Sequence, residues 1–300
     1  EDMRRALLDL FRSRGYQLVI PPLMEYVDSL LTGVGADLDL KTFKLVDQLT
    51  GRLMGVRADI TPQVARIDAH LLAVNAVNRL CYAGSVLHTQ SAGFHRSREP
   101  IQIGAELYGE AGAEADLEIL TLMLQGLAAC GVKALQLDIG HVGVYRALAQ
   151  EARLSREVEH QLFGALQAKD SSAVAVLAAG LPIALRDAFA ALPRLYGDRS
   201  VLAEARACLP QLAAVEAALD TLELLDRGLV NVEAAYDLAE LRGYGYHSGV
   251  VFAAYTGGRS HAIAQGGRYD EVGRVFGQAR PATGFSLDLR ELALARSDTP

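Results

Sequence analysis

The sequence predicts an α+β fold, in which an antiparallel sheet carries flanking helices and an α-helical insertion interrupts the order of the strands. Strand-like segments near both ends of the chain are spaced irregularly among helices, unlike the regular alternation of a doubly wound parallel sheet. Residues 144–240 differ from both ends, because they are rich in alanine and leucine and repeat apolar residues at helical spacing. We therefore expect a core formed by residues 1–143 and 241–300, with a helical insertion at 144–240.

The individual elements follow from local patterns. Apolar residues at helical spacing predict helices, short β-branched and aromatic runs predict strands, and glycine or proline marks their ends. Thr61-Pro62 predicts a helix start, because a threonine hydroxyl can cap a helix and proline fits its first turn. In chain order we expect a helix over residues 2–14, a strand over 16–20, a loop over 33–40, a hairpin of strands 43–46 and 52–56, a helix over 61–74, strands over 79–87 and 101–108, a helix over 113–129, a strand over 135–139, strands over 248–255 and 260–264, a glycine-rich turn at 265–270, and a strand leading into a helix from residue 282.

Composition and charge exclude several classes of protein. The 300 residues are 51% hydrophobic and 22% charged, which is typical of a globular chain. The net charge of −7 is opposite in sign to the basic surface of a nucleic-acid-binding protein. Three cysteines without a CxxC pair, and seven histidines without ligand spacing, predict neither disulfides nor a metal site. No apolar run approaches the roughly 20 residues that cross a bilayer. We therefore expect a cytoplasmic protein with no membrane or nucleic-acid partner.

Two polar groupings suggest a binding site, and each has a plain structural alternative. Gln102, Gly104 and Glu106 alternate along one strand and so share a face, where the glycine leaves room for a small ligand. The alternative is a solvated strand face. Asp59 and Thr61 lie at a strand-to-helix junction, where their oxygens can accept hydrogen bonds from an α-ammonium group. The alternative there is a capped helix start.

Glycine-rich segments in the last quarter of the chain are similarly ambiguous. Gly-Gly-Arg occurs at 257–259 and again at 266–268. Such segments either cradle an anion with backbone N–H groups or form hairpin turns beside surface arginines. The aromatic loop at 241–249 either clamps a carboxylate and a ring or is a tight connection.

Taken in this order, the motifs resemble the catalytic core of histidyl-tRNA synthetase, a class II aminoacyl-tRNA synthetase. The resemblance implies the class II synthetase-like core fold and covers nearly the whole chain, although residues 144–240 match only in placement. The segments that carry it are residues 15–25, similar to the dimer-forming first motif; 57–61, similar to Arg-Pro-Glu-Gly-Thr; 79–109, similar to the second motif and the strand after it; 242–252, similar to the histidine-reading loop Arg-Gly-Leu-Asp-Tyr-Tyr; and Gly-Gly-Arg-Tyr-Asp at 266–270 with Gly-Phe at 284–285.

The resemblance implies a histidine-binding site. In it Asp59 would bind the α-ammonium group, although it is one methylene shorter than the family's glutamate, and Glu106 would read the imidazole. His247 stands where the family has a second loop tyrosine. The residues implied for this site are Asp59, Thr61, Gln102, Glu106, Arg242, Tyr246 and His247.

Two departures from the family affect ATP binding. The family's α-phosphate arginine is replaced in His88-Thr89-Gln90, and its γ-phosphate arginine is replaced by Glu291. A carboxylate repels a phosphate that a guanidinium would attract, so amino-acid activation should be lost. We therefore expect no catalytic residues, cofactor or metal. The third motif is close to the end of the sequence, so we also expect no C-terminal anticodon-binding domain.

A synthetase-like core that keeps amino-acid-binding residues but loses ATP-binding ones resembles the regulatory subunits of ATP phosphoribosyltransferase. This resemblance implies a non-catalytic protein that forms a homodimer within a hetero-oligomer with a short-form catalytic subunit. It also implies feedback inhibition by L-histidine of the first step of histidine biosynthesis, which requires that histidine bind active and inactive assemblies differently. Two alternatives stay open: an amino-acid-activating enzyme and a stand-alone histidine sensor.

Overall fold

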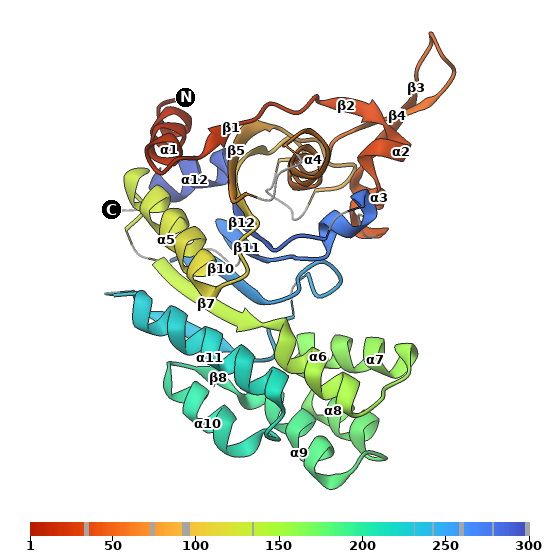
Figure 1. Cartoon of the computed structure of the whole chain (residues 1–300), viewed down its shortest axis with the longest axis vertical. Helices are drawn as coiled ribbons and strands as arrows, with labels where there is room; N and C mark the ends of the chain where they lie inside the picture. The colour runs from red at the N-terminus through yellow and green to blue at the C-terminus, as the bar shows by residue number, and fades with distance from the viewer. Residues whose placement is uncertain are drawn as a thin grey trace. The chain divides into compact units, whose positions relative to one another are not determined.

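A computed structural model describes residues 1–32, 36–72, 76–91, 97–133, 135–230, 232–241, 243–257, 261–277 and 279–297 (Figure 1). The chain divides into two compact units. Unit 1 comprises Glu1–Ala134 and His261–Pro300, and unit 2 comprises Leu135–Ser260. In these described ranges, no helix is long and apolar enough to cross a membrane.

Unit 1 is built on a mixed sheet with the strand order β1-β5-β6-β12-β11. Strand β1 runs parallel to β5, and the other neighbours are antiparallel. The register places Glu106 of β6 between Leu80 of β5 and Gly284 of β12. The strands are β1 (Gln17–Leu18), β5 (Asn78–Ser85), β6 (Ile101–Tyr108), β12 (Ala282–Asp288) and β11 (Ala264–Arg268).

Three helices cover one face of this sheet: α1 (Asp2–Ser13), α5 (Ala113–Ala129) and α12 (Leu289–Ser297). Apolar residues of α1 are buried, and the ring of Phe11 packs edge-on against Phe285 of β12 at 5.8 Å. Ile103 and Ala105 of β6 are fully buried, as the alternation along this strand predicts. The polar residues of β6 therefore point to the opposite face.

The remaining described elements of unit 1 are a second, smaller sheet, three short helices and two helical turns. A three-stranded antiparallel sheet has the order β2-β4-β3, and its β3–β4 hairpin projects from the unit (Figure 1). Helix α4 continues directly into a π-helical turn. These elements are β2 (Met24–Tyr26), α2 (Val27–Leu30), α3 (Ala36–Lys41), β3 (Phe43–Val46), β4 (Leu53–Val56), α4 (Thr61–Ile67), the π-helical turn Asp68–Leu72 and the 3₁₀ turn Val272–Phe276.

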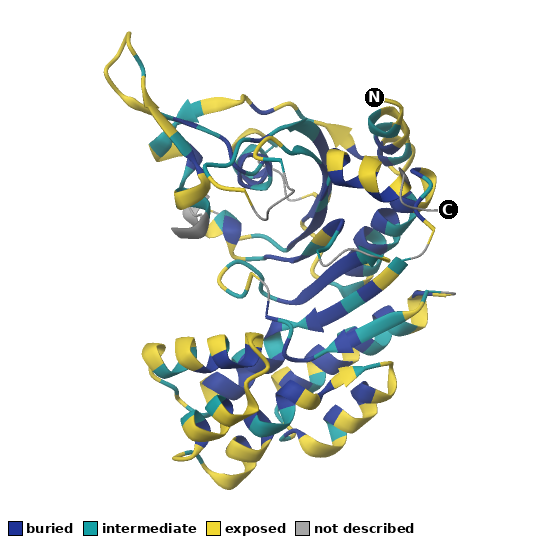
Figure 2. Ribbon diagram, turned by 180° about the vertical axis from the view of Figure 1, so that it is seen from behind, coloured by how far each residue is buried: buried dark blue, intermediate teal, exposed yellow. Residues whose placement is uncertain are grey.

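Within its described residues, unit 2 combines a second set of strands with six α-helices. Its strand order is β10-β7-β9-β8, in which β7 and β9 are parallel and the other pairs antiparallel. Its helices are largely buried along one side and exposed along the other (Figure 2). The elements are β7 (Leu135–His141), α6 (Val142–Glu151), α7 (Arg156–Gln167), α8 (Ser171–Ala178), α9 (Ile183–Ala191), the 3₁₀ turn Leu192–Arg194, β8 (Tyr196–Gly197), α10 (Ser200–Cys208), α11 (Ala213–Gly228), β9 (Ala234–Asp237) and β10 (Val250–Thr256).

The α+β class is confirmed, with a sheet that is mixed rather than wholly antiparallel. Unit 2 extends beyond residues 144–240 to include β7 and β10, and that stretch holds two short strands besides its helices. The loop expected over 33–40 is wrong for residues 36–40, which are helical. The Thr42 hydroxyl donates to Leu38 O at 2.7 Å, which satisfies a carbonyl at the end of this short helix.

Two expected strands also differ. The strand expected over 16–20 is reduced to Gln17–Leu18. The glycine-rich turn expected at 265–270 is instead mostly the strand Ala264–Arg268, which replaces the one expected over 260–264. Pairing with β12 along its whole length holds these glycines in the sheet, because ladder hydrogen bonds override the turn preference of glycine.

Candidate functional site

The start of helix α4 is shaped by Asp59 rather than by Thr61. The Thr61 backbone N–H donates to Asp59 Oδ1 at 2.9 Å, and the residue at the cap position is Ile60. The expectation that Thr61 caps the helix is therefore wrong. Its hydroxyl points instead towards the sheet, 3.1 Å from Glu106 Oε1 and 3.0 Å from the Tyr82 hydroxyl.

Gln102 joins this junction to strand β6. Its amide nitrogen donates to Asp59 Oδ1 at 2.9 Å, and its amide oxygen accepts from the Ile60 N–H at 2.9 Å. Both of these hydrogen bonds to Asp59 end on Oδ1. Asp59 and Gln102 are half-buried, which leaves this end of the group accessible.

Glu106 is the buried centre of the group. Its carboxyl is 1% exposed and accepts hydrogen bonds from Tyr82 at 3.0 Å, from Thr61, and from the hydroxyl of Tyr269. Burial raises the pKa of Glu106 to about 8, although the three hydroxyl hydrogen bonds act in the opposite direction. The structure thus brings Asp59, Thr61, Gln102 and Glu106 into one hydrogen-bonded group.

Two glycines make room for these side chains. A Cβ atom at Gly284 would stand 1.6 Å from Glu106 Oε2, so only glycine fits opposite this carboxylate. A Cβ atom at Gly104 would stand 2.5 Å from the Tyr82 hydroxyl. The Tyr82 hydroxyl therefore lies beside the space that Gly104 leaves, and the binding of a ligand on this face of the strand stays a prediction.

Sequence reasoning missed both tyrosines that hold Glu106. Tyr82 is the direct partner of Gly104 in the β5–β6 register, and Tyr269 follows β11. Tyr269 belongs to the Gly-Gly-Arg-Tyr-Asp segment, which was a usable signal, whereas nothing local marks Tyr82. Pairing register, not local pattern, selects Tyr82.

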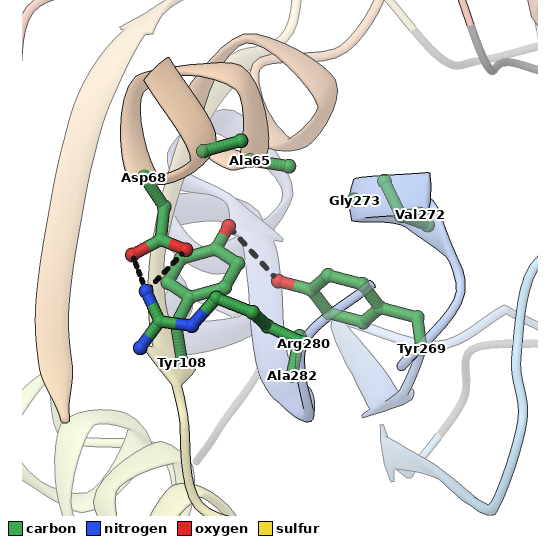
Figure 3. A pocket seen from close by; sticks show the side chains of 9 residues that line it. Ala65, Asp68, Tyr108, Tyr269, Val272, Gly273, Arg280 and Ala282 are labelled. Atoms are coloured by element: carbon green, nitrogen blue, oxygen red, sulfur yellow. Dashed lines mark hydrogen bonds and ion pairs between the residues drawn. The ribbon is translucent and has the colours of Figure 1, made fainter. Parts of the chain in front are cut away.

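A small cavity lies beside Tyr269 (Figure 3). Its volume is about 10 Å³, enough for one water molecule and too small for an amino acid. Asp68 and Arg280 form an ion pair at 3.0 Å on one side, and the hydroxyls of Tyr269 and Tyr108 are 3.3 Å apart on the other. We therefore interpret this cavity as a packing feature beside Tyr269, which binds Glu106, rather than as a site for an amino acid.

Arg268, from the second Gly-Gly-Arg segment, and Arg57 have structural roles. Arg268 is buried and donates to Asp116 at 2.9 and 3.1 Å and to Gly112 O at 2.9 Å, which joins β11 to the start of α5. It is neither a surface arginine nor part of an anion cradle. Arg57 donates to the carbonyl oxygens of Pro21 and Ser85, at 2.7 and 2.9 Å.

His88 and Glu291, the two positions that the sequence resemblance aligns with phosphate-binding arginines, make contacts within unit 1. His88 Nε2 lies 2.9 Å from Ala58 O. Glu291 is 4% exposed, and its carboxylate lies 2.8 Å from His261 Nε2. The neighbouring Arg290 donates to Glu99 O at 2.8 Å, so its guanidinium is held at the surface. Among the described residues, no three His, Cys, Asp or Glu side chains are grouped to hold a metal.

The remaining expected site residues belong to unit 2. Tyr246 and His247 lie in a tight turn in which both backbone N–H groups donate to Gly243 O at 2.7 Å. Gly243 has φ of +65°, which favours glycine, and the Tyr246 and His247 rings meet edge-on at 5.4 Å. Arg242 lies outside the described residues, as does most of the glycine–arginine segment at 257–259.

The architecture of unit 1 and the order of the motifs define a class II synthetase-like core. A model of the histidyl-tRNA synthetase family matches residues 1–292. A structure described as an ATP phosphoribosyltransferase regulatory subunit/histidyl-tRNA synthetase from Bacillus halodurans aligns with a TM-score of 0.87 and 28% identity, covering 98% of this chain and 78% of that one.

Two relatives of known name show to which group of histidyl-tRNA synthetase-like proteins the chain belongs. The ATP phosphoribosyltransferase regulatory subunit of Thiobacillus denitrificans is 83% identical over 297 residues, covering 99% of this chain and 92% of the relative. The corresponding protein of Ralstonia nicotianae is 62% identical over 293 residues, covering 98% and 76%. This chain belongs to the ATP phosphoribosyltransferase regulatory subunit family, within the histidyl-tRNA synthetase-like proteins.

Proposed function

We propose that this chain is the non-catalytic subunit that a short-form ATP phosphoribosyltransferase requires for the first step of histidine biosynthesis in the cytoplasm. In this proposal it forms a homodimer within a hetero-oligomer. Membership of the regulatory subunit family supports the proposal. The fold supports it too, since a chain of the ATP phosphoribosyltransferase complex of Thermotoga maritima aligns with a TM-score of 0.72 at 17% identity, covering 96% of both chains.

The surroundings of Glu291 support a non-catalytic role. Amino-acid activation develops negative charge on a transferring phosphate, which positive groups must stabilise. The resemblance aligns the buried residue Glu291 with the family's arginine, and one of its carboxylate oxygens lies 2.8 Å from His261 Nε2. Arg290 is bonded to Glu99 and does not replace the lost charge. We expect no amino-acid-dependent exchange of pyrophosphate into ATP.

We further propose that L-histidine is the effector and that it binds through the Asp59–Glu106 group. The observation that carries this proposal is that the half-buried Asp59 and the fully buried Glu106 both bind Thr61, while Gln102 also binds Asp59. A carboxylate oxygen of Asp59 suits an α-ammonium group, and the Glu106 carboxyl can form a hydrogen bond with an imidazole nitrogen. The resemblance alone adds Arg242, Tyr246 and His247 to this proposal.

The decisive experiment measures phosphoribosyl-ATP formation by a short-form catalytic subunit with and without this chain, across a histidine titration. We expect strong activation by the chain, reversed by histidine. Glu106→Ala should weaken the histidine effect, and Glu106→Gln tests the same point with side-chain volume retained. Glu114→Gln, which changes an exposed carboxylate of unit 1, serves as the control.

Each contrary result points to a different alternative. Activation that persists with an unchanged inhibition curve in both Glu106 variants would place the effector elsewhere. Histidine binding without any activation would favour a stand-alone sensor. Amino-acid-dependent pyrophosphate exchange would favour an activating enzyme.

A further inference from the structure

The side-chain amide of Gln102 lies between the Asp59 carboxylate and the backbone at the start of helix α4. Its oxygen accepts from the Ile60 N–H at 2.9 Å, and its nitrogen donates to Asp59 Oδ1 at 2.9 Å. A backbone N–H can only donate, so the amide oxygen must face Ile60 and the amide nitrogen must face Asp59. Exchanging the two ends of the amide would set donor against donor and acceptor against acceptor. The backbone of Ile60 therefore fixes the direction in which Gln102 donates.

The Asp59 carboxylate is held by two hydrogen bonds of different kinds. The bond from the Thr61 N–H is local, because its donor is only two residues away in the chain. The bond from Gln102 comes from strand β6, 43 positions away in the sequence. A local turn leaves the side chain freedom to rotate with its own segment, whereas a bond from the sheet fixes the carboxylate relative to Glu106 on the same strand. Gln102 is thus the residue that sets the direction of Asp59 within unit 1.

The backbone that leads to Asp59 is already fixed by Arg57. The Arg57 N–H donates to Leu23 O at 3.0 Å, and its carbonyl oxygen accepts from the Leu87 N–H at 3.0 Å. Its guanidinium is buried over Gly84 of β5, where the Cβ atom of any other residue would collide with it. With the main chain held in this way, rotation of the Asp59 side chain is the freedom that Gln102 removes.

We propose that Gln102 is a positioning residue that aims the Asp59 carboxylate at the ammonium group of the effector, without binding the effector itself. The proposal rests on the assignment of histidine to the Asp59–Glu106 group. It replaces the direct ligand contact that the resemblance implies for Gln102 with alignment of Asp59. Because a carboxylate fixed in advance loses less freedom on binding, a ligand with an ammonium group gains affinity from Gln102 and a ligand without one does not.

Replacements that remove only the amide test this role. Gln102→Met retains the length and approximate volume of the side chain but has no amide to bind Ile60 or Asp59. Gln102→Leu is a second apolar replacement, in case the first does not fold. Gln265→Met is the matched control, because Gln265 is an exposed glutamine on β11 of the same sheet. Thermal unfolding of each variant shows whether the fold persists.

Three ligands separate alignment of Asp59 from general damage to the site. Calorimetry measures their binding to the complex of this chain with the catalytic subunit. L-histidine and histamine both carry an ammonium group and the imidazole ring, whereas imidazolepropionate keeps the ring and lacks the ammonium group. We expect Gln102→Met to weaken binding of histidine and histamine about tenfold, and binding of imidazolepropionate less than about twofold. Gln265→Met should match the parent for all three.

A double-mutant cycle with Asp59→Asn separates alignment from direct contact. The asparagine has no charge for Gln102 to aim at the ammonium group, so a positioning residue loses its effect in this background. We expect Gln102→Met to weaken histidine binding there by less than about twofold further. A side chain that itself binds the ligand would cost the same factor in both backgrounds.

Equal losses for all three ligands, an undiminished loss in the Asp59→Asn background, or no loss at all would each overturn the proposal. All three results leave histidine binding by the parent intact, so the proposed function survives them. A parent complex that does not bind histidine instead removes the effector assignment, and this inference falls with it.

Discussion

Gly284 and Glu106 face each other across the β6–β12 ladder at a separation that admits no side chain at the glycine. The Cβ of any other residue at position 284 would stand 1.6 Å from Glu106 Oε2. This relation ties the identity of a residue in β12 to the placement of a buried carboxylate in β6. It also makes the packing of the site testable without any ligand.

We expect Gly284→Ala to lower the free energy of unfolding by about 3 kcal/mol, because the alanine methyl displaces the Glu106 carboxyl and breaks its hydrogen bonds. Urea unfolding measures this loss. In a Glu106→Ala background the same change should cost less, since the clash with the carboxyl is gone and the 2.8 Å approach of the Cβ atom to Ala105 O is what is left. Equal losses in both backgrounds would contradict the assigned contact.

The raised pKa of Glu106 predicts a pH-dependent stability. Its pKa is raised from 4.5 to about 8, so the folded chain binds this proton more tightly than the unfolded chain does. The contribution is therefore fully present below about pH 4.5 and is lost as pH rises towards 8. The free energy of unfolding should therefore fall between pH 5 and about pH 8. We expect the fall to be smaller in Glu106→Gln and as large as in the parent in Glu114→Gln.

Asp59→Asn separates the structural role of Asp59 from its proposed role in binding. An asparagine oxygen can still accept from the Thr61 N–H and the Gln102 amide, so the junction should keep its stability. The negative charge that would attract an ammonium group is lost, and we expect the half-inhibiting histidine concentration to rise more than about tenfold. An inhibition curve that matches the parent would exclude Asp59 from the effector site.

We expect the Asp68–Arg280 ion pair, which lines the cavity beside Tyr269, to contribute strongly to the free energy of unfolding. Asp68 is 2% exposed and binds Arg280 at 3.0 Å and Asn78 Nδ2 at 2.6 Å. Arg280→Met leaves a buried carboxylate without its cation, and we expect a loss of about 3 kcal/mol in unfolding free energy. Adding Asp68→Asn should recover much of that loss; chemical denaturation of the double variant checks it.

Local patterns predicted which side chains of unit 1 share a face, but not what holds them there. The two-residue period placed Gln102 and Glu106 together, because alternation is a property of the strand itself. This period could not predict that Tyr82 contacts Glu106, because the position of Tyr82 depends on the pairing of β5 with β6. Thr61 was assigned to the helix cap because its hydroxyl suits that role, whereas tertiary contacts with Glu106 directed it elsewhere.

Burial was equally hard to predict for charged residues. Arg268 follows two glycines, which suggested an exposed turn, but pairing of β11 with β12 buries it against Asp116. Glu291 gave no local sign that it would be buried beside His261, which is 30 residues away. The Gly-Gly-Arg pattern itself marks Arg268 as a candidate, whereas only the resemblance to a known family marks Glu291.

The strand order of unit 1 has a consequence for synthesis of the chain. Strand β12 lies between β6 and β11, yet it is made after the whole of unit 2, with Ala282 pairing to Tyr108. At the usual pace of translation the ribosome needs roughly ten to thirty seconds to cover that interval. During this time one edge of β6 has no strand to pair with, and an unpaired edge invites pairing with other chains. The nascent chain thus depends on β12 to complete the centre of its first sheet, and protection by a chaperone matters most in that interval.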